Sequence, residues 1–482
     1  MHSGKNIFGQ NGYRIVFCIA DNECEEITLD QKEVKMSITT SPDVKITPLI
    51  PCQLPKNKVY VCPESAWYPD SDGKWQLHPF AFDRWDVEEM SYYDGCSLHV
   101  GLNPFNIFKV HGSDYLNLLS CCTINTFKNF PVGKARHVVF CDGGGKILLD
   151  GICIRTGEED FLGFNLVDPL FLNQQMGNPF QIESENLREN YAVMQLCGIR
   201  SLEVVEQVCR QDLHDLEFMY STEAKIDGKD VRILRTGMSG TLAYEIHTTA
   251  ADAPEIYQKI LNLGADYGVQ EIGRLCYVNQ HCEGSIFQLA EHYNIRFEME
   301  GDQFILSGSL PRDSELQYHS PFDCGWGDLV RFDHDFMGKE ALLAESQRPH
   351  NTAVHLIWNK EDILKVQEAV MDPEKRVDYM DMGGDYDYKN NCSTIHMDAI
   401  YDGDKLIGVS SDRMLSAKTR EMISICTIAE EYAVEGKEVE VLWGNPGTYQ
   451  MRIRANVTLF PYIKEDRNNN IDIEKIPRPI FE

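Results

Sequence analysis

Five short runs of apolar and polar residues, each ended by turn-forming residues, fill the last third of the chain, at 394–403, 405–412, 421–429, 438–444 and 450–460. Runs of strand length at this spacing are typical of a small antiparallel β-barrel or sandwich. Pro349 stands before them, shortly after the helix-like run EALLAES, and marks the domain boundary that we predict. The sequence therefore predicts a C-terminal β-barrel domain over residues 349–482.

The region from 76 to 348 mixes helical and strand patterns. Asp252, Pro254 and Gly264 stand where the N-cap, first turn and end of a helix are expected. The other predicted segments are a helix beginning at Ser113 as N-cap, a helix over 201–209, and strands over 135–142, 146–155, 160–168 and 230–249. Because strands and helices alternate irregularly, the predicted fold class is α+β.

Residues 1–75 contain short strand-like runs broken by Pro51, Pro55, Pro63 and Pro69. Proline cannot donate to a strand ladder, so these runs indicate hairpins and turns rather than a separate enzyme domain. We therefore predict an N-terminal extension over residues 1–75.

The charge of the chain excludes two classes of partner. Its 45 Lys and Arg against 75 Asp and Glu give a net charge of −30, which repels nucleic-acid phosphates and anionic lipid. A length of 482 residues suggests two or three domains. No run reaches the ~18–20 apolar residues of a membrane helix, and the first residues lack a secretory-signal pattern. We expect a cytoplasmic protein with no nucleic-acid or membrane partner.

Familiar catalytic and metal-binding motifs are missing from the sequence. The sixteen cysteines form no C-x-x-C and the histidines no H-E-x-x-H, so we expect reduced cysteines and no metal. The glycines at 143–145 before Lys146 lack the spacing of a phosphate-binding loop and predict a hairpin turn. Isolated histidines such as His99, His111 and His319 are expected to be structural or solvated.

Three blocks carry the functional signal, in this order along the chain: M-Q-L-C-G at 194–198, R-T-G-M-S-G-T-L-A-Y-E-I at 235–246, and I-G-R-L-C-Y-V-N-Q-H-C-E-G at 272–284. The second block resembles the glycine-rich signature of the glycine-cleavage T-protein superfamily, the folate-dependent aminomethyltransferases. The third resembles the segment that follows it there and ends in E-G. The M-S-G-T-L variant, Tyr277, and the tail segments at 442–444 and 454–462 are closer to the tetrahydrofolate-dependent aryl-methyl-ether O-demethylases of the vanillate and syringate type. The resemblance covers about residues 80–345 and 400–465.

This resemblance implies an architecture and a folate site. It implies a three-domain cloverleaf around a central folate opening, with two interwoven α+β domains over 76–348 and the barrel after them. It implies that Glu245 binds the pterin ring, because a carboxylate can accept two N–H bonds from an aminopyrimidine edge. Gln195, Met238, Arg274 and Asp150 are the other residues that it places at the folate. Since reduced folates are anions, Arg235, Arg274 and Lys146 are the cations that we expect near them.

Tyr277 is the catalytic residue that the resemblance implies. Methyl transfer from an aryl ether to N5 of tetrahydrofolate leaves a phenoxide, whose conjugate acid has a pKa close to the ~10 of tyrosine. A proton or a strong hydrogen bond from Tyr277 would stabilise the charge that develops on the leaving oxygen. The expected products are 5-methyltetrahydrofolate and a phenol.

The donor half of the site departs from the demethylase pattern. The family's F-D-x-S-H-M segment reads V-G-L-N-P-F at 100–105, although His99 lies nearby, and Asp168-Pro169 stands where an arginine grips an aromatic carboxylate. Ser285-Ile286-Phe287 replaces a stretch that carries a tryptophan. The donor is therefore left open between a methoxyaromatic, an N-methyl or sulfonium compound, and the aminomethyl group of glycine cleavage. A folate-binding protein without catalysis is also left open, as is the oligomeric state, a homodimer included.

Overall fold

The computed structural model of the chain describes residues 61–63, 77–79, 81–100, 106–188, 190–289, 291–297, 301–302, 305–382 and 394–481. The chain divides into two compact units, Met1–Lys45 and Ile46–Glu482, and every described residue belongs to the second. Of the predicted N-terminal extension, only the short strand β1 (Val61–Pro63) is described, paired with β2 (Leu77–Pro79). The rest of that prediction lies outside the described residues. None of the helices in the described part combines the length and apolar character needed to span a bilayer.

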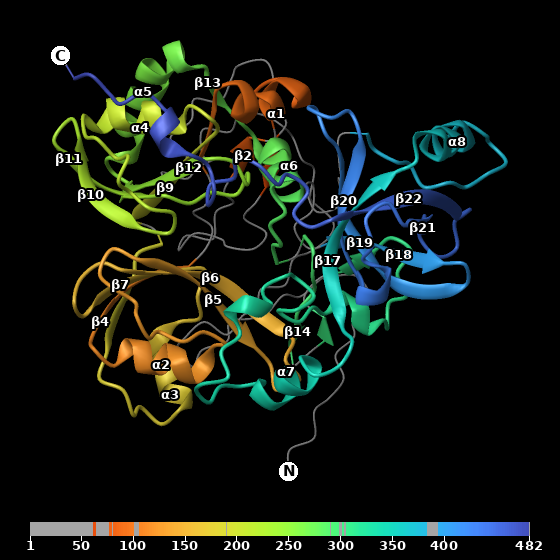
Figure 1. Cartoon of the computed structure of the whole chain (residues 1–482), viewed down its shortest axis with the longest axis horizontal. Coiled ribbons are helices and arrows are strands. Elements are labelled where there is room, and N and C mark those ends of the chain that lie inside the picture. The colour runs from red at the N-terminus through yellow and green to blue at the C-terminus, as the bar shows by residue number, and fades with distance from the viewer. Residues whose placement is uncertain are drawn as a thin grey trace, which may run out of the picture. The chain divides into compact units, whose positions relative to one another are not determined.

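A six-stranded sheet holds the first and second sequence blocks together. Its order is β10-β11-β12-β9-β3-β13, and Figure 1 labels all of these strands except β3. The strands are β3 (Cys96–Val100), β9 (Tyr191–Cys197), β10 (Ser221–Ile226), β11 (Lys229–Leu234), β12 (Ala243–Thr249) and β13 (Val269–Glu271). All pairs are antiparallel except β13 with β3. The strand predicted over 230–249 is thus two strands, because its glycines form a loop between β11 and β12.

A five-stranded antiparallel sheet is inserted in the sequence between β3 and β9, in the order β5-β6-β7-β4-β8. Its strands are β4 (Ile107–His111), β5 (Ala135–Cys141), β6 (Ile147–Arg155), β7 (Asp160–Phe164) and β8 (Glu183–Asn186). Residues 143–145 form the hairpin turn between β5 and β6, as predicted. The chain therefore enters the first sheet, builds the second, and returns to complete the first.

The C-terminal strands close into a six-stranded antiparallel barrel, because β18 pairs with both β19 and β21 at the two ends of the order β18-β19-β20-β17-β22-β21. They are β17 (Asn351–Trp358), β18 (Thr394–Asp402), β19 (Lys405–Leu415), β20 (Met422–Ala429), β21 (Glu438–Trp443) and β22 (Met451–Leu459). The short strand β16 (Ile305–Ser307) adds to β18 in parallel. The predicted α+β fold with a C-terminal barrel is confirmed. The boundaries of the domains stay a prediction.

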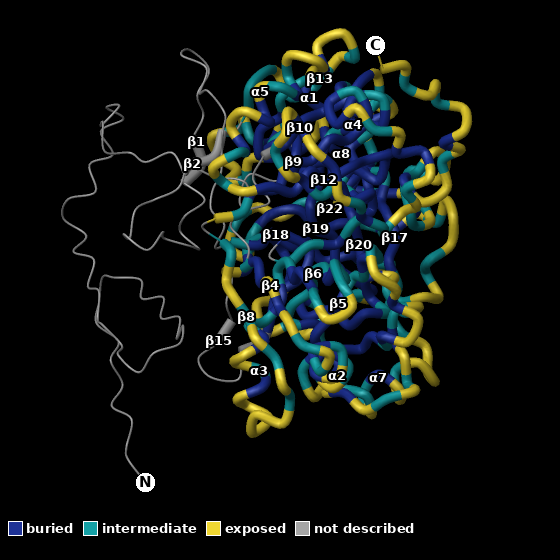
Figure 2. The backbone as a smooth tube through the Cα atoms, turned by 90° about the vertical axis from the view of Figure 1, so that its left-hand side faces the viewer, coloured by how far each residue is buried: buried dark blue, intermediate teal, exposed yellow. Residues whose placement is uncertain are grey.

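The helices cover the sheets and supply much of the core. They are α1 (Trp85–Asp94), α2 (Tyr115–Cys122), α3 (Pro169–Gln175), α4 (Ser201–Cys209), α5 (Ala253–Gly264), α6 (Arg274–Gly284), α7 (Lys339–Glu345) and α8 (Lys360–Val370). Figure 2 shows the labelled barrel strands mainly as buried or intermediate segments and many exposed residues in loops. The helix predicted from Ser113 begins one residue later than expected, with Asp114 at the N-cap. Asp252 takes its predicted cap position.

Candidate functional site

A row of three side chains crosses the six-stranded sheet. His99 on β3 is the ladder partner of Gln195 on β9, and Gln195 is the partner of Glu245 on β12. Side chains of directly paired residues point to the same face of a sheet. The opposite face carries Leu196 and Tyr244, which belong to the apolar core beneath α4 and α5. The sheet therefore separates an apolar core on one face from a polar row on the other.

Glu245 is the centre of this row. Its side chain is buried, with 7% of the residue exposed. Gln195 Nε2 donates to Oε1 of Glu245 at 3.2 Å, and Oε2 lies 3.1 Å from Nε2 of His247. Among the described residues each oxygen thus has one donor. A carboxylate oxygen can accept two hydrogen bonds, so each oxygen keeps room for one further donor. This buried carboxylate can thus accept a pair of N–H groups.

The glycine-rich loop between β11 and β12 is attached to the same row. The backbone N–H of Met238 donates to Oε1 of Gln195 at 3.3 Å. Gly240 has a φ of +73°, and a Cβ there would lie 2.9 Å from Cα of Gly284. A Cβ on Gly284 would lie 2.8 Å from the carbonyl oxygen of Met238. The second and third sequence blocks therefore pack backbone against backbone, which is the physical reason for glycine at these two positions.

Helix α6 is buried along its whole length, although five of its eleven residues carry polar or charged side chains. Glu88 on α1 accepts the backbone N–H of Gly273 at the start of α6, and burial raises the pKa of Glu88 to about 7 against three backbone N–H groups that lower it. At the far end, the hydroxyls of Tyr92 and Tyr93 donate to Glu283. Buried polar groups of this kind must be hydrogen-bonded. These bonds fix α6, and hence Tyr277, against α1.

Tyr277 lies on α6 and contacts the polar row. Its ring stacks on the imidazole of His99, with centroids 4.0 Å apart and planes 7° from parallel. His281, one turn further on, meets the same ring edge-on at 4.8 Å, and burial lowers the pKa of His281 to about 4. Tyr277 is 6% exposed. The structure therefore brings Tyr277, Gln195 and Glu245 into one group, and adds His99, which the sequence did not assign to the site.

Asp150 and Arg274 have separate surroundings. Asp150 on β6 bonds His137 at 2.8 Å and accepts the hydroxyl of Tyr293 at 2.5 Å. Arg274 is the first residue of α6 and is 5% exposed. The folate contacts of both residues stay predictions.

Two of the three expected cations are bound to other groups. Lys146 donates to Asp323 at 3.3 Å. The guanidinium of Arg235 donates to the carbonyl of Leu216 and to both the side chain and the carbonyl of Asn468. Asn468 in turn donates to the carbonyl oxygens of Gly240 and Ala243. Arg235 thus anchors a segment that follows the barrel, which is a structural task that its place in the motif did not reveal.

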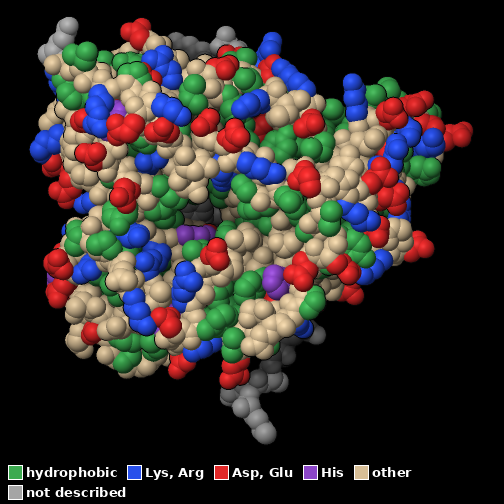
Figure 3. All heavy atoms as spheres, viewed as in Figure 1, with side chains coloured by type: hydrophobic (Ala, Val, Ile, Leu, Met, Phe, Trp, Pro, Cys, Tyr) green, Lys and Arg blue, Asp and Glu red, His purple; other side chains and the backbone are tan. Residues whose placement is uncertain are grey.

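The surface of this region is hollowed. Figure 3 shows a hollow between the part of the molecule that carries β12 and the part that carries β6, with histidine side chains at its edge. Acidic and basic side chains are scattered over the rest of this face.

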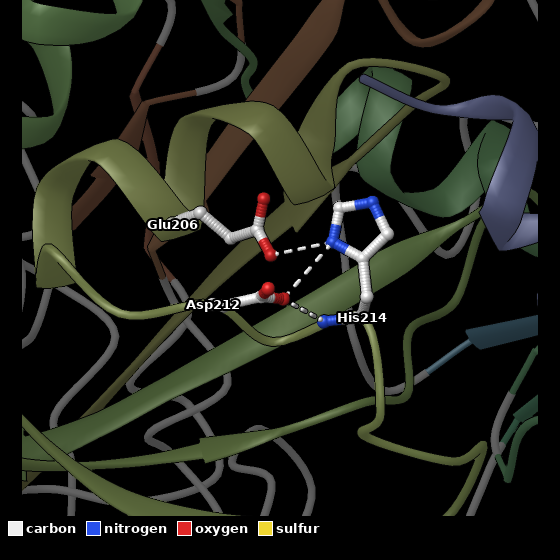
Figure 4. Close-up of side chains that lie close together, drawn as sticks. All are labelled: Glu206, Asp212 and His214. Carbon is white, nitrogen blue, oxygen red and sulfur yellow. Dashed lines mark hydrogen bonds and ion pairs between the residues drawn. The ribbon is translucent and has the colours of Figure 1, made fainter. Parts of the chain in front are cut away.

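A second cluster of ionisable side chains joins α4, which carries Glu206, to the loop after it, which carries Asp212 and His214 (Figure 4). Nδ1 of His214 lies 2.9 Å from Glu206 and 3.3 Å from Asp212, while Nε2 bonds the carbonyl of Ile476 at 3.1 Å. A carbonyl only accepts, so Nε2 carries a proton. Oε1 of Glu206 also accepts the backbone N–H of Leu213. Through these hydrogen bonds the cluster anchors the segment around Ile476, and this structural role explains its arrangement.

A third cluster joins His292 to Asp412, with Nε2 of the histidine 3.4 Å from the carboxylate. Nδ1 of His292 accepts the backbone N–H of Gln288 at 2.9 Å. The lone pair of Nδ1 is therefore used, and Nε2 keeps its proton and faces the carboxylate. That tautomer offers no lone pair to a metal ion.

Comparison with known proteins gives three related results. Residues 64–292 match the model of the GCVT N-terminal domain family. Sesamin methylene transferase of Sinomonas sp. (strain No.22) is 34% identical over 81% of this chain and 90% of its own length. Syringate O-demethylase of Sphingobium sp. (strain NBRC 103272 / SYK-6) is 28% identical over 82% of this chain and 92% of its own.

The fold has a solved counterpart. The glycine cleavage system aminomethyltransferase T from Bartonella henselae superposes with a TM-score of 0.60 over 81% of this chain and 93% of that chain, at 16% identity. At this identity the likeness concerns the fold alone. It agrees with the α+β architecture and the barrel described above.

Proposed function

Because the chain belongs to the glycine-cleavage T-protein family, we propose that it is a tetrahydrofolate-dependent O-demethylase. It transfers a methyl group from a methoxylated aromatic compound to N5 of tetrahydrofolate and releases a phenol. The observation that carries this proposal is the juxtaposition of Tyr277, a proton donor, with the buried carboxylate of Glu245, through His99 and Gln195.

The described residues fit a reduced folate. Glu245 offers one free acceptor position on each carboxylate oxygen, which matches the paired N–H groups of an aminopyrimidine ring. Gln195 bonds both Glu245 and the backbone of Met238, so the amide connects the carboxylate to the glycine-rich loop. We assign Glu245, Gln195 and Met238 to the pterin, with Arg274 and Asp150 as further folate contacts.

When bound, tetrahydrofolate would supply the nitrogen that takes the methyl group, and the proton that this nitrogen gives up would replace the one that Tyr277 donates. The protein supplies the proton that the leaving oxygen of the donor needs. As the methyl carbon–oxygen bond breaks, the hydroxyl of Tyr277 donates to the leaving oxygen, so that a phenol forms in place of a phenoxide. Residues around Tyr277 keep water away, because Val193 and Val278 pack against it with Phe164 and Met238 beside them.

A methylene group is the second candidate for the one-carbon unit. The 34% identity over most of both chains with a relative named for methylene transfer favours it. The two candidates differ in the oxidation level of the folate product, which mass spectrometry reads directly.

The test is anaerobic incubation of the protein with tetrahydrofolate and a pool of methoxyaromatics, methylene-bridged aromatic ethers, betaines and sulfonium compounds. A methyl- or methylene-folate with its matching phenol identifies the donor. Tyr277→Phe should lower kcat by about 100-fold or more with an aryl ether. It should change kcat little with a sulfonium or betaine, whose leaving group departs neutral.

Two results would count against the proposal. Folate binding without any product across the whole pool would leave a binding protein in place of an enzyme. Full activity of Tyr277→Phe on an aryl ether would show that Tyr277 is not the proton donor.

A further inference from the structure

His247 follows Glu245 by two residues on β12, so both side chains lie on the same face of the strand. The carboxylate of Glu245 stands between two neutral donors, with Gln195 on Oε1 and His247 on Oε2. A carboxylate bonded at both oxygens cannot turn about its last torsion without losing one of them. The plane of this carboxylate is thus set by His247 together with Gln195.

The tautomer of His247 follows from its burial. The residue is 2% exposed, and Nδ1 is buried with no hydrogen-bond partner among the described residues. A proton on Nδ1 would therefore be a buried donor without an acceptor, which is costly. The proton belongs on Nε2, where it is donated to Glu245. The ring is neutral and acts as a fixed donor.

The ring of His247 is also held in place by aromatic neighbours from both sheets. Phe164, the last residue of β7 in the five-stranded sheet, meets it edge-on at 4.9 Å. Tyr191, the first residue of β9 in the six-stranded sheet, meets it at 5.9 Å. His247 therefore lies where the two sheets meet, and its orientation depends on their packing.

We propose that His247 is a positioning residue that orients the Glu245 carboxylate for the 2-amino and ring N–H groups of the pterin. This inference rests on the proposed function, since it assumes that Glu245 binds folate. Fixing the carboxylate before the ligand arrives removes the cost of ordering it on binding. Because His247 acts through Glu245, its effect on binding is tied to one part of the ligand, the two N–H groups that Glu245 accepts, rather than to the fold in general.

The experiment measures binding of 5-formyltetrahydrofolate and of its 2-desamino analogue by calorimetry, with three variants. His247→Phe removes the donor and keeps a ring between Phe164 and Tyr191. His247→Gln keeps a donor. His355→Phe is the matched control, because His355 is a buried histidine on the barrel strand β17 and bonds the carbonyl of Cys282 rather than a residue of the row.

His247→Phe should raise the Kd for 5-formyltetrahydrofolate about tenfold. It should raise the Kd for the 2-desamino analogue by less, so that discrimination between the two ligands shrinks. His247→Gln should restore most of the affinity, and His355→Phe should leave both Kd values unchanged. A merely structural role for His247 would weaken both ligands equally.

Nitrogen-15 spectra of the wild-type protein give a second measurement, with His247→Gln used to assign the signal. The proposal requires a protonated Nε2 and an unprotonated Nδ1, with the Nε2 signal shifting when 5-formyltetrahydrofolate binds. An unchanged Kd in His247→Phe, equal weakening of both ligands, or a proton on Nδ1 would overturn it. If 5-formyltetrahydrofolate does not bind the wild-type protein at all, the folate site itself fails, and this outcome is distinct from a failure of His247 alone.

Discussion

At the scale of single residues, the acceptor character of Glu245 is its decisive property. Both of its hydrogen-bond partners among the described residues are donors: the side-chain amide of Gln195 and the imidazole of His247. An amide in its place would turn an N–H group toward one of these donors, and it would also remove a charge from the bonds to a ligand. Hydrogen bonds to a charged group are worth about 1.5–3 kcal/mol.

We therefore expect Glu245→Gln to raise the Kd for 5-formyltetrahydrofolate by about 10- to 100-fold, measured by calorimetry. Glu271→Gln is the control, since Glu271 is bonded to Tyr257 at the far edge of the sheet and its loss should leave the Kd unchanged. An unaltered Kd in Glu245→Gln would mean that the pterin is bound elsewhere.

The sequence motifs brought Gln195, Glu245 and Tyr277 to attention, and the structure places these three together. They could not reveal His99 or His247. His99 joins the site through the pairing of β3 with β9, nearly 100 residues apart in the sequence, and then through a ring contact with α6. Strand pairings between residues so far apart leave no local sequence pattern. The contacts of a single histidine in a strand therefore become visible only in the structure.

At the scale of elements, strands were easier to predict than α6. The barrel strands alternate or are bounded by turns, and each predicted run became a strand. Helix α6 is buried on every side and its polar residues bond to α1, so it lacks the one-sided apolar pattern by which a helix is usually recognised. Its place is fixed instead by Gly284, which packs against the glycine-rich loop.

Gly284→Ala should therefore destabilise the protein, although alanine is normally the better helix former. A Cβ at this position would lie 2.8 Å from backbone atoms of the loop, and overpacking of this kind costs about 1–3 kcal/mol. Chemical denaturation followed by fluorescence gives the free energy of unfolding. Gly143→Ala is the control, since a Cβ there meets nothing within 4 Å. Equal stability of the two variants would contradict the tight packing.

At the scale of the whole molecule, the segment after the barrel returns to the first sheet. Ile471, Ile473 and Ile476 pack into the apolar core beneath α4 and α5. His214 holds this segment through the carbonyl of Ile476 and is faced by Glu206, Asp212 and Arg478. Burial works to lower the pKa of His214, but the carbonyl and the Glu206 carboxylate outweigh it, so the pKa is raised above its ordinary 6.5.

A raised pKa means that the folded state binds this proton more tightly than the unfolded state does. The stabilisation is therefore complete below pH 6.5 and is lost as the pH rises through the folded-state pKa. Burial also raises the pKa of Glu206, and this acts in the same direction. We expect hydrogen exchange in residues 471–476 to accelerate, relative to the intrinsic rate, as the pH rises above 6.5. His214→Phe should remove this dependence; a pH profile that survives the substitution would assign it to other groups.

The hydrogen bonds from Arg467 to the end of α6 and from Asn468 to the glycine-rich loop also impose an order on biosynthesis. Arg467 donates to the carbonyl of Gly284, and Asn468 donates to that of Gly240. Both residues are translated after the last barrel strand, more than 180 residues behind the loops that they fasten. While the ribosome is still making the barrel, the hydrogen bonds from Arg467 and Asn468 cannot yet form. The nascent chain should thus acquire its folate-binding conformation only once these late residues have left the exit tunnel, so ligand cannot assist the folding of the earlier sheets during translation.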